Sequence, residues 1–200
     1  MVKIKVNREL IIKFCLIRVQ LAGMQRVLSV LVENESGVLT RIAGLFSRRG
    51  FNIESLTVGP TDNPGYARMT ITVNGSNFAV EQITKQLHKL INVIRITDLT
   101  ESSFVDRELA LIKVTSTAST RSEIIQIADL FRGHIVDVAE DSLIVEVTGD
   151  EGKISAIVHL LTKFGIKEIA RTGRVALARG TRIDETQVTR RVPLRMVTSS

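Results

Sequence analysis

The segment 33–39, with the sequence ENESGVL, is the part of the chain whose residue types best suit ligand binding. It follows an apolar run and precedes a helical pattern, so it joins a strand to the first turn of a helix. The first backbone N–H groups of a helix lack partners and carry the positive end of its dipole, so they attract an anion such as a carboxylate. Gly37 lets a ligand approach the backbone closely. Asn34 offers a donor and an acceptor, which suits an α-amino group beside that carboxylate.

Two interpretations of this segment stay open from the residues alone. In the first, Asn34 and Gly37 help to bind a small ligand, and Asn52, which opens the next strand, reaches the loop of a second copy in an edge-paired dimer. In the second, Asn34 and Ser36 only cap the helix and Gly37 only turns the chain. Residues of these types cap or turn helices more often than they bind a ligand.

Motifs for catalysis and metal binding are absent from the sequence. His88, His134 and His159 are far apart and form no HxxxH or HExxH pattern. Cys15 is the only cysteine, so the chain has no intramolecular disulfide and no CxxC motif, as is usual in a reducing compartment. The sequence has no GxSxG elbow, Walker loop or GxGxxG fingerprint. We therefore expect neither a metal site nor an independent enzyme.

The elements around the loop follow one order of strands and helices. Residues 26–32 form a nearly continuous apolar run, which is typical of a strand buried on both faces. Apolar residues then recur at helical spacing from Val38 to Phe46, and the pattern ends in Arg48, Arg49 and a C-cap glycine, Gly50. The other expected elements are strands at 51–58, 66–73 and 93–99 and a helix with Val80, Ile83, Leu87, Leu90 and Ile91 on one face.

The second half of the chain repeats this order. Residues 108–114 (ELALIKV) mirror 26–32 at an offset of 82, and 157–170 run parallel to 83–96 at an offset of 74. The repeat predicts an α+β fold of two ferredoxin-like βαββαβ units, with antiparallel sheets and helices on one face. A free edge strand in such a sheet favours a homodimer. The expected domains are 24–100 and 101–180, flanked by a poorly ordered leader at 1–23 and a basic tail at 181–200.

The basic charge belongs to the ends of the chain. The formal net charge is +6, but 1–23 hold five basic residues against one acidic residue and 181–200 hold four against two. Residues 24–180 therefore have no net charge. Lys13 and Arg18 interrupt the apolar part of the leader, so we expect an organelle-targeting remnant or an extension upstream of Met24 rather than a secretory signal. No apolar run is long enough for a transmembrane helix, and we expect no membrane partner.

RNA binding is an alternative, because the βαββαβ fold also serves as an RNA-recognition module that stacks bases on aromatic side chains of its central strands. Here the strand at 26–32 has no aromatic residue, and aromatic residues make up only 4% of the chain. The stacking platform is missing and the folded part is neutral. We therefore expect no nucleic-acid partner.

A family resemblance covers residues 24–180. The run VLSVLVENESGVLTRIAGLFSRRGFNIESLTVGPTDNPGYARMTITV, followed by EQITKQLHKLINVIRITDLT, resembles the regulatory (small) subunit of acetolactate synthase, also called acetohydroxyacid synthase. The segments RELALIKV, DLFRGHIVDV and GIKEIARTGRVALARG continue the resemblance through the second half. In this family the first unit is an ACT domain, a fold that senses small amino acids.

The resemblance implies a non-catalytic subunit in the biosynthesis of the branched-chain amino acids valine, leucine and isoleucine. Such a subunit binds the catalytic subunit, raises its activity and confers feedback inhibition by valine. Thiamine diphosphate, FAD and magnesium then belong to the catalytic subunit and not to this chain. The implied location is the cytoplasm, or a plastid or mitochondrion in a eukaryote. The alternative is a free-standing ACT-type amino-acid sensor with another client protein.

The valine site implied by the resemblance spans a homodimer formed through the ACT domains, and valine would act by shifting that dimer between arrangements. The loop at 115–120 in the second unit, TSTAST, has no glycine where the first unit has ENESG. We therefore expect the second unit to serve dimerisation or contact with the catalytic subunit instead. The implied site residues are Asn34, Gly37, Val38 and Leu39 of one subunit and Asn52 and Ile53 of the other.

Overall fold

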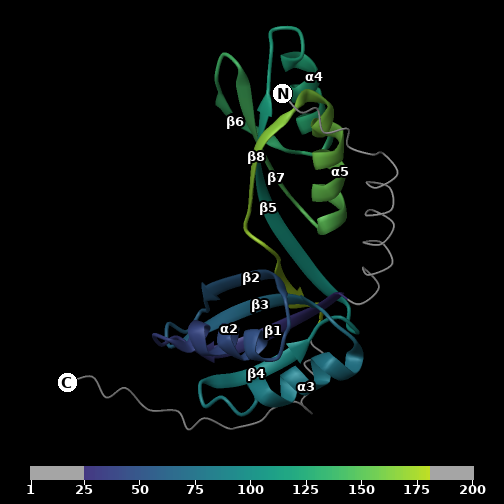
Figure 1. The fold of residues 1–200 in the computed structure, drawn as a ribbon. Coiled ribbons are helices and arrows are strands. Elements are labelled where there is room, and N and C mark those ends of the chain that lie inside the picture. The colour runs from purple at the N-terminus through teal and green to yellow at the C-terminus, as the bar shows by residue number, and fades with distance from the viewer. Residues whose placement is uncertain (1–24, 181–200) are drawn as a thin grey trace, which may run out of the picture.

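The computed structural model describes residues 25–180 as two βαββαβ units, one above the other in Figure 1. Each unit is an antiparallel sheet with its own hydrophobic core, which confirms the expected α+β fold of two ferredoxin-like units. The leader at 1–23, which includes Cys15, and the tail at 181–200 lie outside the described residues.

The first unit has the strand order β2-β3-β1-β4, with every neighbouring pair antiparallel. The central strand β1 explains the continuous apolar run. Its Leu28, Val30 and Val32 are buried in the core beneath the helices, and Val27 and Ser29, on the other face, are also buried. The elements are β1 Gln25–Glu33, α2 Val38–Arg48, β2 Ile53–Pro60, β3 Tyr66–Asn74, α3 Asn77–Leu87 and β4 Val93–Asp98.

One residue that the sequence pattern assigned to the core of this unit, Ile91, is exposed instead. Ile91 is 78% exposed, although helical spacing put it on the apolar face. The helix α3 ends at Leu87, and turns in which Leu90 donates to the Leu87 carbonyl and Val93 to the Leu90 carbonyl follow it. Because helical periodicity stops at Leu87, Leu90 still packs on the core while Ile91 points away from it.

The second unit has the equivalent strand order β6-β7-β5-β8, so β6 takes the place of β2. A ninth strand, β9, pairs only with β5 and was not expected from the sequence. The elements are β5 Phe104–Thr115, α4 Arg121–Leu130, β6 His134–Val138, β7 Ser142–Gly149, α5 Glu151–Leu161, a short 3-10 helix Thr162–Phe164, β8 Ile166–Arg171 and β9 Val175–Ala178.

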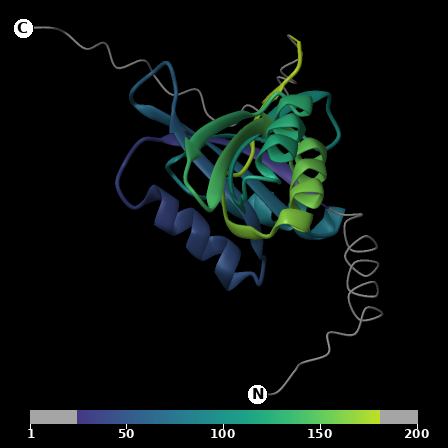
Figure 2. The ribbon, with the colours of Figure 1, turned by 90° about the horizontal axis from the view of Figure 1, so that it is seen from above.

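The long strand β5 connects the two units, as Figure 1 shows. Its first four residues pair with β9, and the rest pair with β7 and β8, so the expected split near 101–106 falls across its start. This β5–β9 ribbon lies on the face of the first sheet opposite α2 and α3. Phe104 and Ala176 of the ribbon pack there against Val27 and Leu99. Figure 2, seen from above, places the second unit over the first sheet.

A strap formed by residues 172–178 joins the second unit to the first sheet. The Thr57 hydroxyl donates to the Thr172 carbonyl at 3.2 Å, and the Ala176 N–H donates to the Thr70 hydroxyl at 3.4 Å. Gly173 has φ +81, and a Cβ there would lie 3.1 Å from Thr57 Oγ1 and 3.2 Å from Ser55 Cβ. The positive φ favours glycine, and a Cβ at this position would require Thr57 and Ser55 to shift by a few tenths of an ångström.

We expect the variant Gly173→Ala to weaken the contact between the units. Its matched control is Gly180→Ala, since Gly180 also has a positive φ, +69, but nothing lies within 4 Å of its Cβ position. Both variants place a Cβ at a positive φ, so this conformational cost is common to them. The tight contacts at position 173 should therefore lower the free energy of unfolding of Gly173→Ala by about 1–3 kcal/mol more than that of the control. Denaturant titration of both variants measures this difference, and equal losses would contradict the packing argument.

Candidate functional site

The loop between β1 and α2 leaves the start of the helix uncapped. Gly37 is the N-cap, with φ 85 and ψ −10, and no side chain accepts a hydrogen bond from the first turn. The Asn34 side chain instead donates to the Pro64 carbonyl at 3.2 Å. The interpretation in which Asn34 and Ser36 merely cap the helix is therefore wrong. Gly37 does turn the chain, and its missing side chain leaves open space in front of the helix.

The first turn of α2 has unused donors. The Arg41 N–H donates to the Gly37 carbonyl at 3.0 Å, but within the described chain the N–H groups of Leu39 and Thr40 make no hydrogen bond. Val38 is 3% exposed and anchors the helix in the core, whereas Leu39 is 43% exposed beside the free donors. This arrangement suits a carboxylate with an apolar group attached.

Asn52 and Ile53 lie at the opposite end of the same sheet. Along β3, Tyr66 pairs with Glu33 next to the loop, and Val73 pairs with Ile53. These two positions of β3 are seven residues apart, which at the usual strand rise is about 23 Å. One chain therefore does not bring Asn52 to Asn34. The Asn52 side chain donates instead to Glu54 Oε1 at 2.9 Å.

The helix α4 of the second unit also begins without a side-chain cap, but the hydroxyls of the loop before it bond to one another. The Thr120 hydroxyl accepts from the Thr117 N–H at 2.9 Å. Arg121 Nη2 donates to the carbonyls of Ala139 at 2.7 Å and Glu140 at 3.0 Å, which ties α4 to the neighbouring turn. No residue of this loop has the left-handed conformation of Gly37. The two loops therefore differ in backbone conformation and in hydroxyl contacts, and the expectation that this loop does not bind the effector in the same way stays a prediction.

A salt bridge beside this turn shifts the pKa of one carboxyl group, that of Asp141. Lys167 Nζ donates to Asp141 Oδ2 at 2.5 Å, with the carboxylate side chain 75% exposed. This hydrogen bond and the lysine charge lower the pKa of the Asp141 carboxyl below its usual value. Because the pair is exposed to solvent, we assign it little weight in stability.

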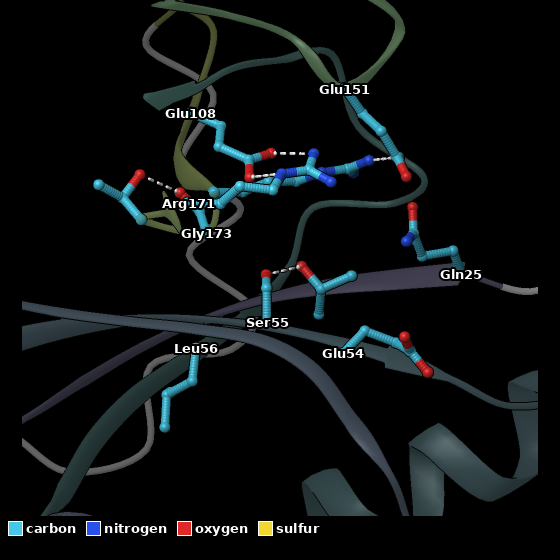
Figure 3. A pocket seen from close by; sticks show the side chains of 11 residues that line it. Gln25, Glu54, Ser55, Leu56, Glu108, Glu151, Arg171 and Gly173 are labelled. Atoms are coloured by element: carbon cyan, nitrogen blue, oxygen red, sulfur yellow. Dashed lines mark hydrogen bonds and ion pairs between the residues drawn. The ribbon is translucent and has the colours of Figure 1, made fainter. Parts of the chain in front are cut away.

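A cavity of about 340 Å³ lies between the two units. Figure 3 shows Glu108, Arg171 and Glu151 on one side of it and Glu54, Ser55 and Leu56 on the other. The lining residues come from both units and from the strap: Gln25, Glu54, Ser55, Leu56, Thr72, Glu108, Glu151, Arg171, Thr172, Gly173 and Arg174.

Apart from Glu54, the charged groups that line this cavity form ion pairs. Glu108, whose side chain is 6% exposed, accepts from Arg171 Nε at 2.5 Å and from Nη2 at 2.9 Å. Arg174 is paired with both Asp106 and Glu151. The hydroxyl of Ser55 donates to that of Thr72 at 3.1 Å, and no histidine is among the lining residues. The Glu54 carboxylate accepts from the amides of Asn52 and Asn74. The cavity therefore has the chemistry of a structural contact between the units.

Two further observations concern the part of the chain that the structure describes. No three His, Cys, Asp or Glu side chains gather there as they would to hold a metal ion. None of its helices combines the length and the apolar character needed to cross a bilayer.

Comparison with known proteins identifies both units. A family model described as "AHAS small subunit-like ACT domain" matches residues 28–95, and one described as "Small subunit of acetolactate synthase" matches 107–180. The chain belongs to the acetolactate synthase small-subunit family. A small subunit from Bacillus subtilis is 55% identical over 160 residues, covering 79% of this chain and 92% of that protein. A probable small subunit from Archaeoglobus fulgidus is 56% identical over 157 residues, covering 78% and 98%.

A solved structure supports the same assignment. The acetolactate synthase small subunit from Thermotoga maritima superposes with a TM-score of 0.72 at 43% identity, covering 78% of this chain and 98% of that one. The chain is thus a small, regulatory subunit with an ACT domain, as the sequence resemblance implied.

Sequence reasoning missed the residues of the contact between the units. Glu108 was assigned only to a strand, and no role was given to Arg171 or Arg174. The sequence offered one signal, because the two arginines flank Gly173 in the segment ARTGRVALA, directly before an apolar run. Their partners are distant in sequence, 63 residues away for Arg171 and Glu108, so no local pattern could reveal the pairing.

We expect the variant Glu108→Gln to lower the free energy of unfolding by about 2 kcal/mol, because the charged Arg171 loses its bidentate partner in a buried position. The control is Glu123→Gln, whose carboxylate pairs with Lys163 at 2.5 Å with both side chains more than half exposed. That change should cost less than about 1 kcal/mol. Denaturant titrations that rank the two variants in the opposite order would contradict the structural role of Glu108.

Proposed function

We propose that this chain activates the catalytic subunit of acetolactate synthase and makes it sensitive to feedback inhibition by valine. The observation that carries the proposal is the uncapped start of α2, in which Gly37 leaves open space before the free N–H groups of Leu39 and Thr40. This start of α2 lies in the unit that matches the ACT domain of this family. The family membership favours this function over a free-standing sensor with another client.

In this proposal the valine carboxylate accepts hydrogen bonds from the first turn of α2 and the Asn34 side chain meets the α-amino group. Leu39 and the half-buried Ile53, which also packs on the core of its own unit, provide apolar surface for the isopropyl group. Val38 holds the helix in place from the core side. A methylene difference changes such binding by only about 1–3 kcal/mol, so this increment does not decide among valine, leucine and isoleucine.

The site needs a second copy of the chain. Strand β2 is an edge of the first sheet, and its last residue Pro60 leads into the turn beside the Asn34 loop. If two copies pair antiparallel along β2, the start of one β2 lies beside the end of the other. Asn52 of the partner subunit then approaches Asn34. This homodimer also covers an edge strand that is otherwise open to pairing.

Valine would act by favouring one arrangement of this dimer, which docks differently on the catalytic subunit. The second unit would contribute to dimerisation or docking, since its equivalent loop has no counterpart of Gly37 and its hydroxyls bond within the loop. On the family membership alone, we assign thiamine diphosphate, FAD and magnesium to the catalytic subunit. The cytoplasmic location remains a prediction.

Reconstitution with a catalytic subunit tests the function. Adding the chain should raise acetolactate production, and valine should then suppress it. In Gly37→Asp, a negative charge stands where the valine carboxylate binds, so we expect the half-inhibiting valine concentration to rise by about a hundredfold or more, equivalent to about 2.7 kcal/mol.

Activation should persist in Gly37→Asp, since the substitution lies at the loop and not in the core. Gly50→Asp is its matched control, because Gly50 also has a positive φ, +71, and open space at its Cβ. It should keep its valine response. An unchanged rate on mixing would overturn the function, and valine binding without any effect on the catalytic subunit would favour the free-standing sensor.

A mixture of Asn34→Ala and Asn52→Ala chains tests whether the site is shared between subunits. Each variant alone should bind valine poorly. In a mixed dimer, one site combines the intact Asn34 of one chain with the intact Asn52 of the other, so tight binding should return at that site. Calorimetry of the re-equilibrated mixture measures the recovered stoichiometry. Failure to recover any tight site would argue against the shared arrangement.

A further inference from the structure

The loop that carries Asn34 is fastened by a buried side chain, Asn92, which directly precedes β4. Asn92 is 7% exposed. Its Nδ2 donates to Glu33 Oε2 at 2.7 Å and to Glu35 Oε2 at 3.1 Å. Its Oδ1 accepts from Arg41 Nη1 at 2.8 Å. Both donors and the carbonyl of this amide are therefore used inside the protein.

The orientation of this amide matches the charges around it. The Nδ2 end faces the carboxylates of Glu33 and Glu35, and the carbonyl end faces the guanidinium of Arg41. A flipped amide would place its oxygen against the two anions and its N–H groups against the cation. Each of these hydrogen bonds involves a charged partner, which makes it stronger than a neutral one.

The contacts of Asn92 determine where Asn34 points. Glu33 and Glu35 flank Asn34, and the Glu35 N–H donates to the Glu33 carbonyl at 3.0 Å, so Asn34 is at the centre of a three-residue turn. The backbone carbonyl of Asn92 also accepts from the Glu33 N–H at 2.9 Å. The Asn92 side chain also accepts from Arg41, a residue of α2. Asn92 therefore connects the loop, the helix and β4.

We infer that Asn92 is a positioning residue of the effector site. It fixes Asn34 and the first turn of α2 in the arrangement that receives the carboxylate and ammonium of an α-amino acid, without touching that ligand. The inference rests on the proposed function, since it concerns the same site. It adds a residue 58 positions away from Asn34 in the sequence, on a different element.

The variant Asn92→Asp has almost the same shape but loses both donors. Its carboxylate faces those of Glu33 and Glu35, so repulsion should release the loop, while the hydrogen bond from Arg41 remains possible. In the reconstituted holoenzyme we expect the half-inhibiting valine concentration to rise by about tenfold or more. The activation of the catalytic subunit without valine should be unchanged.

The control Asn63→Asp adds the same charge in the neighbouring turn. Asn63 Oδ1 accepts from the Gly65 N–H at 3.0 Å, and a carboxylate oxygen can accept the same bond. The Gly65 carbonyl in turn accepts from the Asn34 N–H at 2.8 Å, so this turn lies against the same loop. The valine response of Asn63→Asp should match the wild type, which would exclude a general charge effect.

A double variant provides the rescue. In Asn92→Asp combined with Glu35→Gln, the amide at position 35 donates to the carboxylate at position 92, which restores a hydrogen bond with reversed polarity. The half-inhibiting valine concentration should return most of the way to the wild-type value. Glu35→Gln alone should not lower the half-inhibiting valine concentration. The wild type, the two single variants and the double variant therefore form a double-mutant cycle, in which we expect a favourable coupling between positions 35 and 92.

The outcomes separate this inference from the proposed function. If Asn92→Asp lowers the melting temperature but leaves the valine response intact, Asn92 is only structural and the inference fails, while the function stands. If Asn92→Asp also loses activation, the double variant decides, because recovered activation without a recovered valine response would overturn the inference. If the wild type itself shows no valine response, both fail together.

Discussion

The fold depends on burying both faces of the central strand β1. The helices α2 and α3 cover one face, where Leu28, Val30 and Val32 lie in the core. The β5–β9 ribbon covers the other, where Val27 packs with Ala176. A single βαββαβ unit has helices for one face only, so the second unit supplies the missing layer. The two units are therefore joined by a shared hydrophobic contact as well as by the chain.

This arrangement decides which parts of the first unit remain open for binding. The ribbon and strap occupy one face of the sheet and the helices occupy the other, which leaves its edges and its ends. The loop at Asn34–Gly37 lies at one end, and Asn52 lies at the other. Because the two halves of the proposed site are separated within one chain, a second copy paired along the edge strand β2 is the arrangement that would complete it. Effector binding would then be linked to dimer geometry.

Local patterns predicted the elements well but not their ends or their distant contacts. The strands around β1 and the helix after Gly37 match, because alternating and helical periodicities report which side chains are buried. The assignment of Ile91 to a helix face was wrong, since α3 ends at Leu87. The strand β9 was missed because it is four residues long and pairs with β5 about 70 positions earlier.

The sequence by itself determined the repeat, the α+β fold, the neutral folded region and the loop around Gly37, as well as the family resemblance. Each of these is encoded in neighbouring residues or in long contiguous runs. Only the tertiary structure decided that Asn34 does not cap α2, that Asn52 lies at the far end of the sheet and that Asn92 fastens the loop. These facts depend on strand register and on side chains tens of residues apart, and local periodicity carries no information about such pairings.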